Sequence, residues 1–248
     1  MNKYSTVILD LFDTILNFNF SHLPTIELKG LRSRTTSKEV YEVFARYYPE
    51  IEFAEFYDPF IESYRQFQEM KLKEFKEFPN RKRFILMLSK MDLTPIEDED
   101  QLIDKMVLAH MNGLTRCIEF PEDNKKTLEY IKTKGYRLAI ISNFDYAPTA
   151  YMLLEKYNIK NLFEEIVISE EVGWRKPKEI IFETAVKKLE ILPQDALFVG
   201  DNFQADVVGS KAVGMDVAWI NRKNLPENRL HPKPDYIIKN LPELENFI

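Results

Sequence analysis

The sequence of 248 residues predicts an α/β fold in two parts, a parallel sheet covered by helices and an inserted α-helical domain. Three observations lead to this prediction. A short apolar run near the N-terminus has the composition of a buried strand. The C-terminal half alternates between strand and helix patterns, and the region between these two parts shows helical periodicity only.

The first predicted strand is the apolar run at residues 7–9, which ends on the carboxylate of Asp10. A run without polar alternation is typical of a strand that is buried on both faces, as in a parallel sheet. Its partner strands must then come from the C-terminal half. Because open α/β sheets bind ligands beyond the carboxyl ends of their strands, Asp10 is a candidate reactive group. The alternative is a carboxylate that only caps a turn.

The middle of the chain is predicted to be helical. Ser37 has the character of a helix N-cap, and no segment between residues 20 and 117 has a convincing strand pattern. Apolar residues recur at helical spacing in three long segments, residues 56–78, 81–91 and 97–115.

Strand and helix patterns alternate after residue 117. Strands are expected at residues 136–141, 166–168, 196–199, 216–220 and 236–238. Helices are expected at residues 124–134, 148–157, 178–189 and 204–213. This order is typical of a parallel sheet with helices on both faces. Residues 1–17 and 118–248 are therefore predicted to form a Rossmann-like core, and residues 18–117 an inserted α-helical cap domain.

The composition disfavours several classes of protein. The formal net charge of −6 argues against nucleic acid as the main ligand, because phosphate backbones attract basic surfaces. Cys117 is the only cysteine, so we expect a buried apolar filler and no internal disulfide. No stretch has the length of a membrane-spanning helix, and residues 7–9 are too short for a signal core. We expect a cytoplasmic protein with neither nucleic acid nor membrane as a partner, and the sequence leaves its oligomeric state open.

Polar residues of complementary kinds follow several of the predicted strands. They are Asp10 and Thr14, Ser142 and Asn143, Lys176, and the pair Asp201 and Asp206. Together they supply a carboxylate nucleophile, hydroxyl donors, a cation and an acidic pair, which phosphoryl transfer requires. Each also has a structural alternative: the Ser-Asn pair can cap a helix, the lysine can be a surface residue, and Asp206 can satisfy helix donors.

In their order, these motifs resemble the haloacid dehalogenase superfamily of hydrolases, in the subgroup with a helical C1 cap inserted after the first strand. The resemblance covers residues 5–16 and 119–223. It rests on LDLFDT at residues 9–14, ISN at 141–143, GWRKP at 173–177 and VGD at 199–201, followed by Asp206. Each motif follows an apolar run, as the family's fold requires.

The resemblance implies a role for each of these residues. Asp10 would attack phosphorus and become an aspartyl phosphate, which water then hydrolyses. Ser142 would donate a hydrogen bond to the transferring phosphoryl group, and Lys176 would neutralise the developing charge and hold the nucleophile. Thr14 and Asn143 are expected to contact the substrate.

The resemblance also implies a Mg²⁺ ion as cofactor. Its ligands would be Asp10, the backbone carbonyl of Phe12, Asp201 and Asp206, the last directly or through water. An anionic nucleophile must approach an anionic phosphate here, and a cation that binds oxygens of both reduces the repulsion.

Phe12 departs from the usual pattern of the family's phosphatases, which carry a second Asp two residues after the nucleophile. That Asp protonates the leaving group and later activates water, and Phe can do neither. Asp13 would not replace it, since in an extended strand it points to the opposite face. The family's dehalogenases carry an aromatic residue at this position, but they need no metal and usually lack the pair that stands here as Gly200 and Asp201.

The combined pattern predicts a Mg²⁺-dependent phosphatase of small phosphorylated metabolites. A metal-independent 2-haloacid dehalogenase is one alternative, and a catalytically weak relative that binds a phosphorylated ligand or a protein partner is another. The cap would choose the substrate by closing over the site. Within the cap, Arg32, Arg34 and Lys38 are candidate contacts for an anion, and a solvated basic patch is the simpler explanation for them.

Overall fold

The structure is a computed structural model that describes residues 3–28, 30–226 and 230–248. The chain divides into two compact units. The first, here called the core unit, comprises Met1–Phe18, Phe75–Glu77 and Glu119–Ile248, and the second, the cap unit, comprises Asn19–Glu74 and Phe78–Ile118. The short segment Phe75–Glu77 thus groups with the core although cap residues flank it on both sides.

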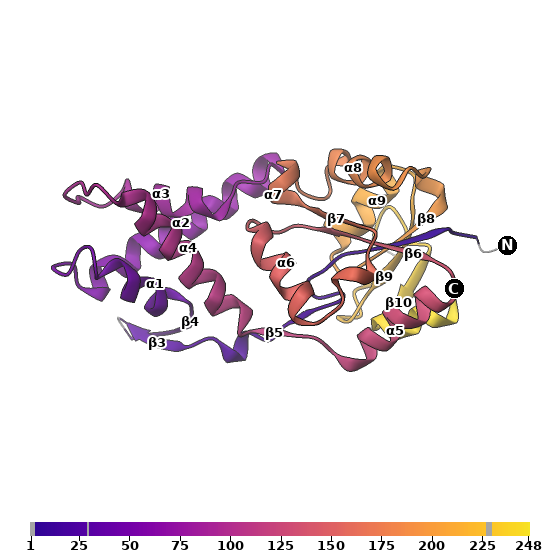
Figure 1. Cartoon of the computed structure of the whole chain (residues 1–248), viewed down its shortest axis with the longest axis horizontal. Helices are drawn as coiled ribbons and strands as arrows, with labels where there is room; N and C mark the ends of the chain where they lie inside the picture. Colours follow the sequence, from indigo (N-terminus) through magenta and orange to yellow (C-terminus); the bar gives the residue numbers. More distant parts are fainter. Residues whose placement is uncertain (1–2, 29, 227–229) are drawn as a thin grey trace. The chain divides into compact units, whose positions relative to one another are not determined.

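The core unit is built on a six-stranded sheet with the order β10-β9-β8-β1-β6-β7 (Figure 1). Every pair of neighbouring strands in it is parallel. This confirms the predicted α/β fold with a Rossmann-like core. The strands are β1 (Thr6–Leu9), β6 (Arg137–Ser142), β7 (Glu165–Ile168), β8 (Ala196–Gly200), β9 (Asp216–Ile220) and β10 (Tyr236–Ile238).

Strand β1 lies at the centre of the sheet, between β6 and β8. Leu9 is in register with Ile140 of β6 and Val199 of β8, and all four residues of β1 are fully buried or nearly so. The polar residues that end these three strands therefore come out at one edge of the sheet. The apolar run that opens the chain is the strand that brings them into register.

Helices cover both faces of the sheet. In Figure 1, α8 and α9 lie on one side of the strands and α5 on the other. Ile8 of β1 and Phe198 of β8 belong to one buried cluster with Ile181 and Phe182 of α8. The helices of the core unit are α5 (Glu122–Thr133), α6 (Ala147–Lys156), α7 (Ser169–Val172), α8 (Glu179–Leu189) and α9 (Gly209–Ala212).

The helix that the sequence predicts at residues 204–213 has two parts. The first, Phe203–Val208, is π-helical, and α9 continues it for four residues. A π-helical turn is wider than an α-helical one and is frequent at functional sites. Asp206, one of the candidate metal ligands, lies within it and is fully buried.

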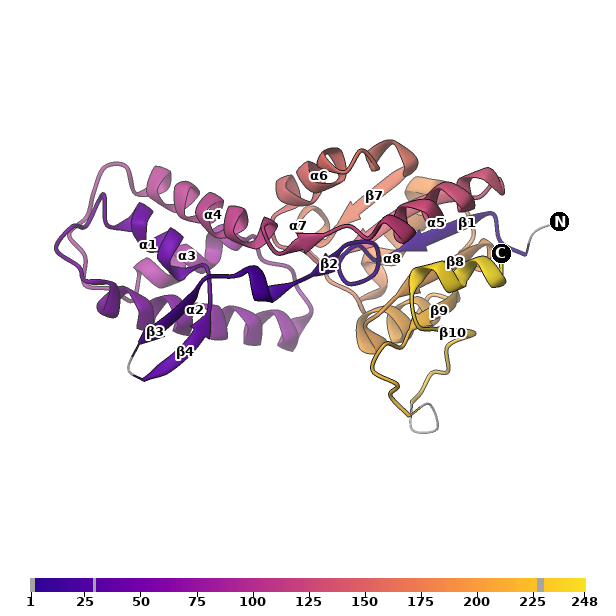
Figure 2. The same cartoon turned by 90° about the horizontal axis from the view of Figure 1, so that it is seen from below.

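Among its described residues, the cap unit contains four α-helices, a 3-10 helix at Phe20–His22 and a β-hairpin (Figure 2). The helices are α1 (Ser37–Phe44), α2 (Phe53–Glu74), α3 (Asn80–Leu88) and α4 (Glu99–Thr115). Thr36, one residue before the predicted N-cap Ser37, is the N-cap of α1.

The prediction of an all-helical cap was wrong at one place. Strands β3 (Thr25–Leu28) and β4 (Leu31–Arg34) form an antiparallel pair. Gly30 follows β3 with a left-handed φ of +74°, which glycine adopts at little cost and which a tight hairpin turn needs. The strand pattern is short, with Ile26 buried between the exposed Thr25 and Glu27, so it did not stand out against the helical periodicity around it.

Two further short strands, β2 (Asn17–Phe18) and β5 (Ile118–Glu119), occupy the places where the chain passes from one unit to the other. Cys117, just before β5, is buried, and its thiol donates to the backbone carbonyl of Gly113 at 3.8 Å. Across residues 3–28, 30–226 and 230–248, we find no helix with the length and apolar character needed to cross a bilayer.

Candidate functional site

Three carboxylates and one ammonium group converge in the core unit. Asp10, Asp201 and Asp206 each have a carboxylate oxygen within 4.8 Å of the others. The ammonium group of Lys176 lies 2.7 Å from Oδ1 of Asp10 and 2.7 Å from Oδ1 of Asp206. Residues that are far apart in sequence thus form one charged cluster at the edge of the sheet where β1 and β8 end.

The backbone around β8 fixes two of these carboxylates. Asp10 follows β1, and its N–H donates to the carbonyl of Val199 at 2.9 Å. Asp201 follows β8, and its carbonyl accepts from the indole N–H of Trp219 at 2.9 Å. Gly200 leaves room for the third acid, because a Cβ atom at this position would overlap the carboxylate of Asp206.

Asp206 is held from two directions. Its Oδ2 accepts from the backbone N–H of Asn202 at 2.8 Å, while its Oδ1 faces Lys176. The side chain of Asn202 in turn caps the π-helical turn by accepting from the N–H of Ala205 at 2.9 Å. The carboxylate of Asp206 therefore has little freedom to move within the cluster.

Lys176 Nζ donates a hydrogen bond to Oδ1 of Asp10 and forms an ion pair with Asp206. Besides the two carboxylates, its Nζ donates to the carbonyl of Ile141 at 2.9 Å. Asn143 holds its backbone in a reciprocal pair: the Lys176 N–H donates to Asn143 Oδ1 at 2.7 Å, and Asn143 Nδ2 donates to the Lys176 carbonyl at 3.0 Å. Asn143, predicted to contact the substrate, thus uses its carboxamide to position Lys176.

Burial and mutual repulsion raise the affinity of two of the acids for protons. Burial raises the pKa of Asp10 to about 7, an effect that Lys176 opposes and Asp206 reinforces. Burial, with the nearby carboxylates of Asp10 and Asp206, raises the pKa of Asp201 to about 8. For Lys176, burial acts to lower the pKa, but the two neighbouring carboxylates outweigh it and the pKa is raised. The raised pKa values of Asp10 and Asp201 reflect that three ionised carboxylates would carry more negative charge than one lysine balances.

Two hydroxyl groups near the cluster carry no hydrogen bond within the described part of the chain. They are Oγ of Ser142, at the end of β6, and Oγ1 of Thr14, and both residues are completely buried. Buried hydroxyls normally have a partner, so each is available to a group that enters the site. The backbone carbonyl of Thr14 is fixed by a hydrogen bond from Asn124 Nδ2 at 3.2 Å.

The residues after the nucleophile candidate form a turn. The ring of Phe12 packs against Phe18 and Phe144, with centroid distances of 5.0 and 4.7 Å. Asp13 is not extended, as the sequence suggested, but left-handed with a φ of +56°, because the chain turns directly after Asp10. Its Oδ1 accepts from the N–H of Phe18 at 3.0 Å, so Asp13 stabilises this turn.

Sequence reasoning missed several residues that support the cluster. Asn124 and Trp219 hold backbone carbonyls beside it, and Glu77 contacts the loop that precedes Lys176. None of these contacts belongs to a local motif, since each joins segments that are distant in sequence, and no signal in the sequence alone would have found them.

Comparison with known proteins shows which family the chain resembles in sequence. The family model described as haloacid dehalogenase-like hydrolase matches residues 53–220, which is more than half of the chain. A glyceraldehyde 3-phosphate phosphatase of Pyrococcus furiosus is 30% identical over 188 residues, which cover 75% of this chain and 75% of that protein. A second protein of the same name, from Methanothermobacter thermautotrophicus, is 35% identical over 51% of this chain and 55% of its own length.

The fold has a close match among solved structures. A 2-haloacid dehalogenase from Pseudomonas syringae pv. Tomato superposes with a TM-score of 0.70 at 18% identity, over 98% of this chain and 97% of that one. At this identity the match bears on the fold alone. The family match and the aligned relatives together establish that the chain belongs to the haloacid dehalogenase-like hydrolases.

Proposed function

We propose that the chain is a Mg²⁺-dependent phosphatase of small phosphorylated metabolites, acting through an aspartyl phosphate on Asp10. The observation that carries the proposal is the buried cluster of Asp10, Asp201 and Asp206 around Lys176. A carboxylate nucleophile, a fixed cation and an acidic pair are the groups that this chemistry needs.

The donor set suits Mg²⁺. When all three carboxylates are ionised, they and the one ammonium group leave two negative charges, which one divalent cation would balance. Magnesium prefers oxygen ligands, and the ligands here would be Asp10, Asp201 and Asp206 together with the backbone carbonyl of Phe12. When bound, the ion supplies positive charge that reduces the repulsion between Asp10 and a phosphate.

In the first step of the proposed reaction, a carboxylate oxygen of Asp10 attacks phosphorus and the bond to the leaving oxygen breaks. Lys176 and the hydroxyls of Ser142 and Thr14 stabilise the phosphoryl oxygens, because they are fixed before the substrate arrives. In the second step, water attacks the aspartyl phosphate, the bond to Asp10 breaks, and inorganic phosphate leaves. The carboxylate of Asp10 is then free for another cycle.

Phe12 limits this reaction, since its ring cannot give a proton to the leaving oxygen or take one from water. General acid–base help is typically worth about 10²–10⁴-fold. We therefore expect slow turnover of alkyl phosphates and faster turnover of phosphates whose leaving group needs no proton.

The relatives suggest where the search for a substrate begins. Two of them are named glyceraldehyde 3-phosphate phosphatases, so a phosphorylated three-carbon metabolite is the first natural candidate. A cytoplasmic location and a cap domain that chooses the substrate are parts of the same proposal. The dehalogenase alternative is less favoured, because a metal-independent reaction gives the cluster of three acids no purpose.

The proposal is tested by measuring phosphate release from p-nitrophenyl phosphate and from glyceraldehyde 3-phosphate. Release is expected with Mg²⁺, and it should stop in EDTA and in Asp10→Asn. Asp123→Asn, which removes an exposed carboxylate of α5, is the matched control and should retain the activity. Activity that survives EDTA, or halide release from 2-chloropropionate without metal, would refute the proposal.

A further inference from the structure

A cavity of about 340 Å³ in the cap unit is bordered by basic side chains. Arg34, Arg65, Arg83 and His110 lie on its wall, together with Phe60 and Tyr64. Every residue of this wall is in the described part of the chain, and none of them is Asp or Glu. This concentration of positive charge is unusual for a protein whose net charge is −6. It is consistent with recognition of an anion.

Arg83 is the most constrained of these side chains, with only 2% of its surface exposed. Its Nη2 donates to the carbonyl of Phe60 at 3.2 Å, and its Nη1 lies 3.3 Å from Nε2 of His110. The guanidinium group also lies over the ring of Phe60, at 4.4 Å from the centroid. Nδ1 of His110 is fixed by the hydroxyl of Thr36 at 2.6 Å. The cavity therefore has a rigid cation in its wall before any ligand binds.

Arg34 and Arg65 provide positive charge from two other elements. Arg34 ends β4, and Arg65 lies on the exposed surface of α2. Arg65 also borders a neighbouring cavity that has Glu62 in its wall, and Oε1 of Glu62 accepts from Lys90 at 2.6 Å. Of the two other anion contacts that the sequence suggested, Arg32 borders that second cavity, and Lys38 is exposed on α1.

The rest of the cavity wall is suited to the apolar part of a small organic molecule. Phe60, Ile61, Tyr64 and Leu114 provide apolar and aromatic surface. A volume of 340 Å³ is within the range of small-molecule sites, which are mostly apolar with a few fixed polar groups. Guanidinium groups bind oxyanions well because their donors match the geometry of phosphate and carboxylate oxygens.

We propose that this cavity is a second anion site, which takes a tetrahedral oxyanion through Arg83 and Arg34. The oxyanion is either the phosphate group of a small organic molecule or free inorganic phosphate. The site lies wholly within the cap unit and needs none of the residues that form the acidic cluster of the core unit.

The three histidines of the chain provide a direct readout. Sulfate and phenylphosphonate, neither of which a phosphatase hydrolyses, are titrated at constant ionic strength into protein labelled with ¹³C at histidine Cε1. The His110 signal, assigned by its loss in His110→Gln, should shift with saturation, while the His231 signal of the core unit should stay in place. A His110 shift that grows linearly with concentration, without saturating, would overturn the proposal.

Arginine substitutions test whether the shift of the His110 signal arises from an anion bound in the cavity. Arg34→Met should weaken binding at least fivefold, and Arg83→Met should abolish it. Arg81→Met is the matched control, because Arg81 is on the same helix as Arg83 but binds Asp100 and Asp104. If Arg83→Met does not fold, the affinity of Arg34→Met is the test, because the Arg34 side chain is exposed and its replacement should not disturb folding. Equal affinity in Arg34→Met and Arg81→Met would overturn the proposal.

The two probes distinguish the sources of the oxyanion. Binding of phenylphosphonate at least fivefold tighter than sulfate supports an organic phosphate, because the phenyl ring then uses the apolar wall. Equal affinities for phenylphosphonate and sulfate support an anion site whose ligand is free inorganic phosphate.

Discussion

Lys176 shows how single side chains determine what the site can do. It is almost completely buried, and its ammonium group is shared by Asp10, Asp206 and the carbonyl of Ile141. A buried charge is tolerated only when it is paired and fully hydrogen-bonded. One lysine cannot balance three acids, so the same geometry that satisfies Lys176 leaves the cluster short of positive charge.

Phe12 is the residue that separates this chain from the usual phosphatase pattern. Phe12→Asp would place a carboxyl group two residues after the nucleophile, where it can protonate the leaving oxygen and activate water. We expect turnover of alkyl phosphates to rise by about 10-fold or more, up to the roughly 10²–10⁴-fold that well-placed general acid–base catalysis can supply. The measurement is kcat with glyceraldehyde 3-phosphate at saturating Mg²⁺.

The control for this variant is Phe12→Asn, which has a similar size and polarity but no proton to transfer at neutral pH. An equal rise in both variants would mean that removal of the ring from its contacts with Phe18 and Phe144 causes the change. No rise in a folded Phe12→Asp variant that binds Mg²⁺ would contradict the role proposed for this position.

Much of the candidate site was visible at the residue scale, for a simple physical reason. In a parallel sheet the carboxyl ends of the strands meet at one edge, so polar residues that follow apolar runs come together. This argument was enough to identify Asp10 and Asp201 as neighbours. It could not show that the carboxamide of Asn143 forms two hydrogen bonds with the backbone of Lys176, because that depends on how two loops pack.

At the scale of elements, the segment Phe75–Glu77 is notable because it lies between cap residues in the sequence but belongs to the core unit. The N–H of Glu77 donates to the carbonyl of Gly173 at 3.0 Å, and the N–H of Arg175 donates to the carbonyl of Phe75 at 2.9 Å. The buried carboxylate of Glu77 also accepts from Ser169 Oγ at 2.5 Å and from Arg175. These bonds fix the loop directly before Lys176.

Glu77→Gln tests whether this connection positions Lys176. The variant keeps the shape of the side chain but removes the charge that strengthens its hydrogen bonds, each worth about 1.5–3 kcal/mol. We expect kcat to fall about 10-fold while KM changes less than twofold, because the nucleophile and its lysine lose alignment. The measurement is steady-state kinetics on samples that unfolding curves show to be folded.

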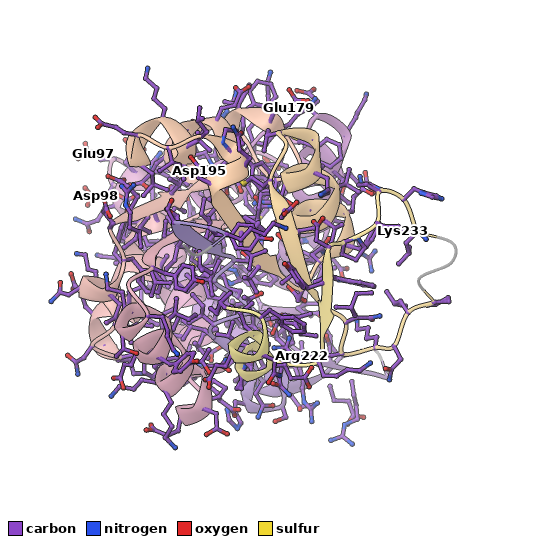
Figure 3. All side chains as sticks on the ribbon, turned by 90° about the vertical axis from the view of Figure 1, so that its right-hand side faces the viewer. Glu97, Asp98, Glu179, Asp195, Arg222 and Lys233 are labelled. Carbon is purple, nitrogen blue, oxygen red and sulfur yellow. The ribbon has the colours of Figure 1, made fainter. Side chains whose placement is uncertain are left out.

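Glu179→Gln is the matched control for that variant. Glu179 begins α8 and is exposed at the surface of the core unit (Figure 3). Its removal should leave kcat unchanged. If Glu77→Gln retains wild-type kcat, or if KM rises as much as kcat falls, Glu77 has no positioning role.

The start of β9 is tied to the N-terminal segment by a charged network. Asp216 accepts from the hydroxyl of Tyr4 at 2.9 Å and lies 2.8 Å from Nζ of Lys3. Burial acts to raise the pKa of Asp216, but these two partners outweigh it and lower the pKa to about 2. The network therefore stabilises the fold only while Asp216 is ionised.

This pKa predicts how stability depends on pH. The contribution is complete above the ordinary Asp pKa of about 3.9 and is lost as the pH falls toward the folded value of about 2. After allowance for solvent screening, Asp216→Asn should lower the free energy of unfolding by about 1 kcal/mol at pH 7. Urea unfolding should give the same difference at pH 5 and a smaller one at pH 3. A difference that grows below pH 4 would contradict the assignment.

The elements themselves were predictable where burial made the sequence pattern strong. All six strands of the core sheet were expected, because each carries an apolar run, and the runs of β1, β6, β8 and β9 are buried on both faces. The hairpin β3–β4 was missed, since strands of four residues in an exposed region have little pattern to detect. The π-helical turn was also missed, because nothing local distinguishes it from an α-helix.

At the scale of the whole molecule, the proposed functions divide between the two units. The residues assigned to phosphoryl transfer all belong to the core unit, and the cationic cavity belongs to the cap unit. The order of the core motifs was enough to predict the fold and the class of enzyme. The choice of substrate could not be predicted, because the cap carries no motif that names a ligand.

The absence of a proton-transfer group at Phe12 has a consequence for the reaction as a whole. An aryl phosphate such as p-nitrophenyl phosphate needs no proton on its leaving oxygen, so it can form the aspartyl phosphate readily. Hydrolysis of this ester still needs an activated water, which no neighbouring carboxylate at position 12 supplies. The covalent species should therefore accumulate during turnover.

Trapping this species is the most direct test of the central claim. The protein is mixed with p-nitrophenyl phosphate and Mg²⁺, quenched in acid during turnover, and digested for mass spectrometry. We predict a phosphoryl group on the peptide that contains Asp10, which is absent in EDTA and in Asp10→Asn. Phosphate release that continues without any such adduct, or an adduct on another residue, would contradict the account.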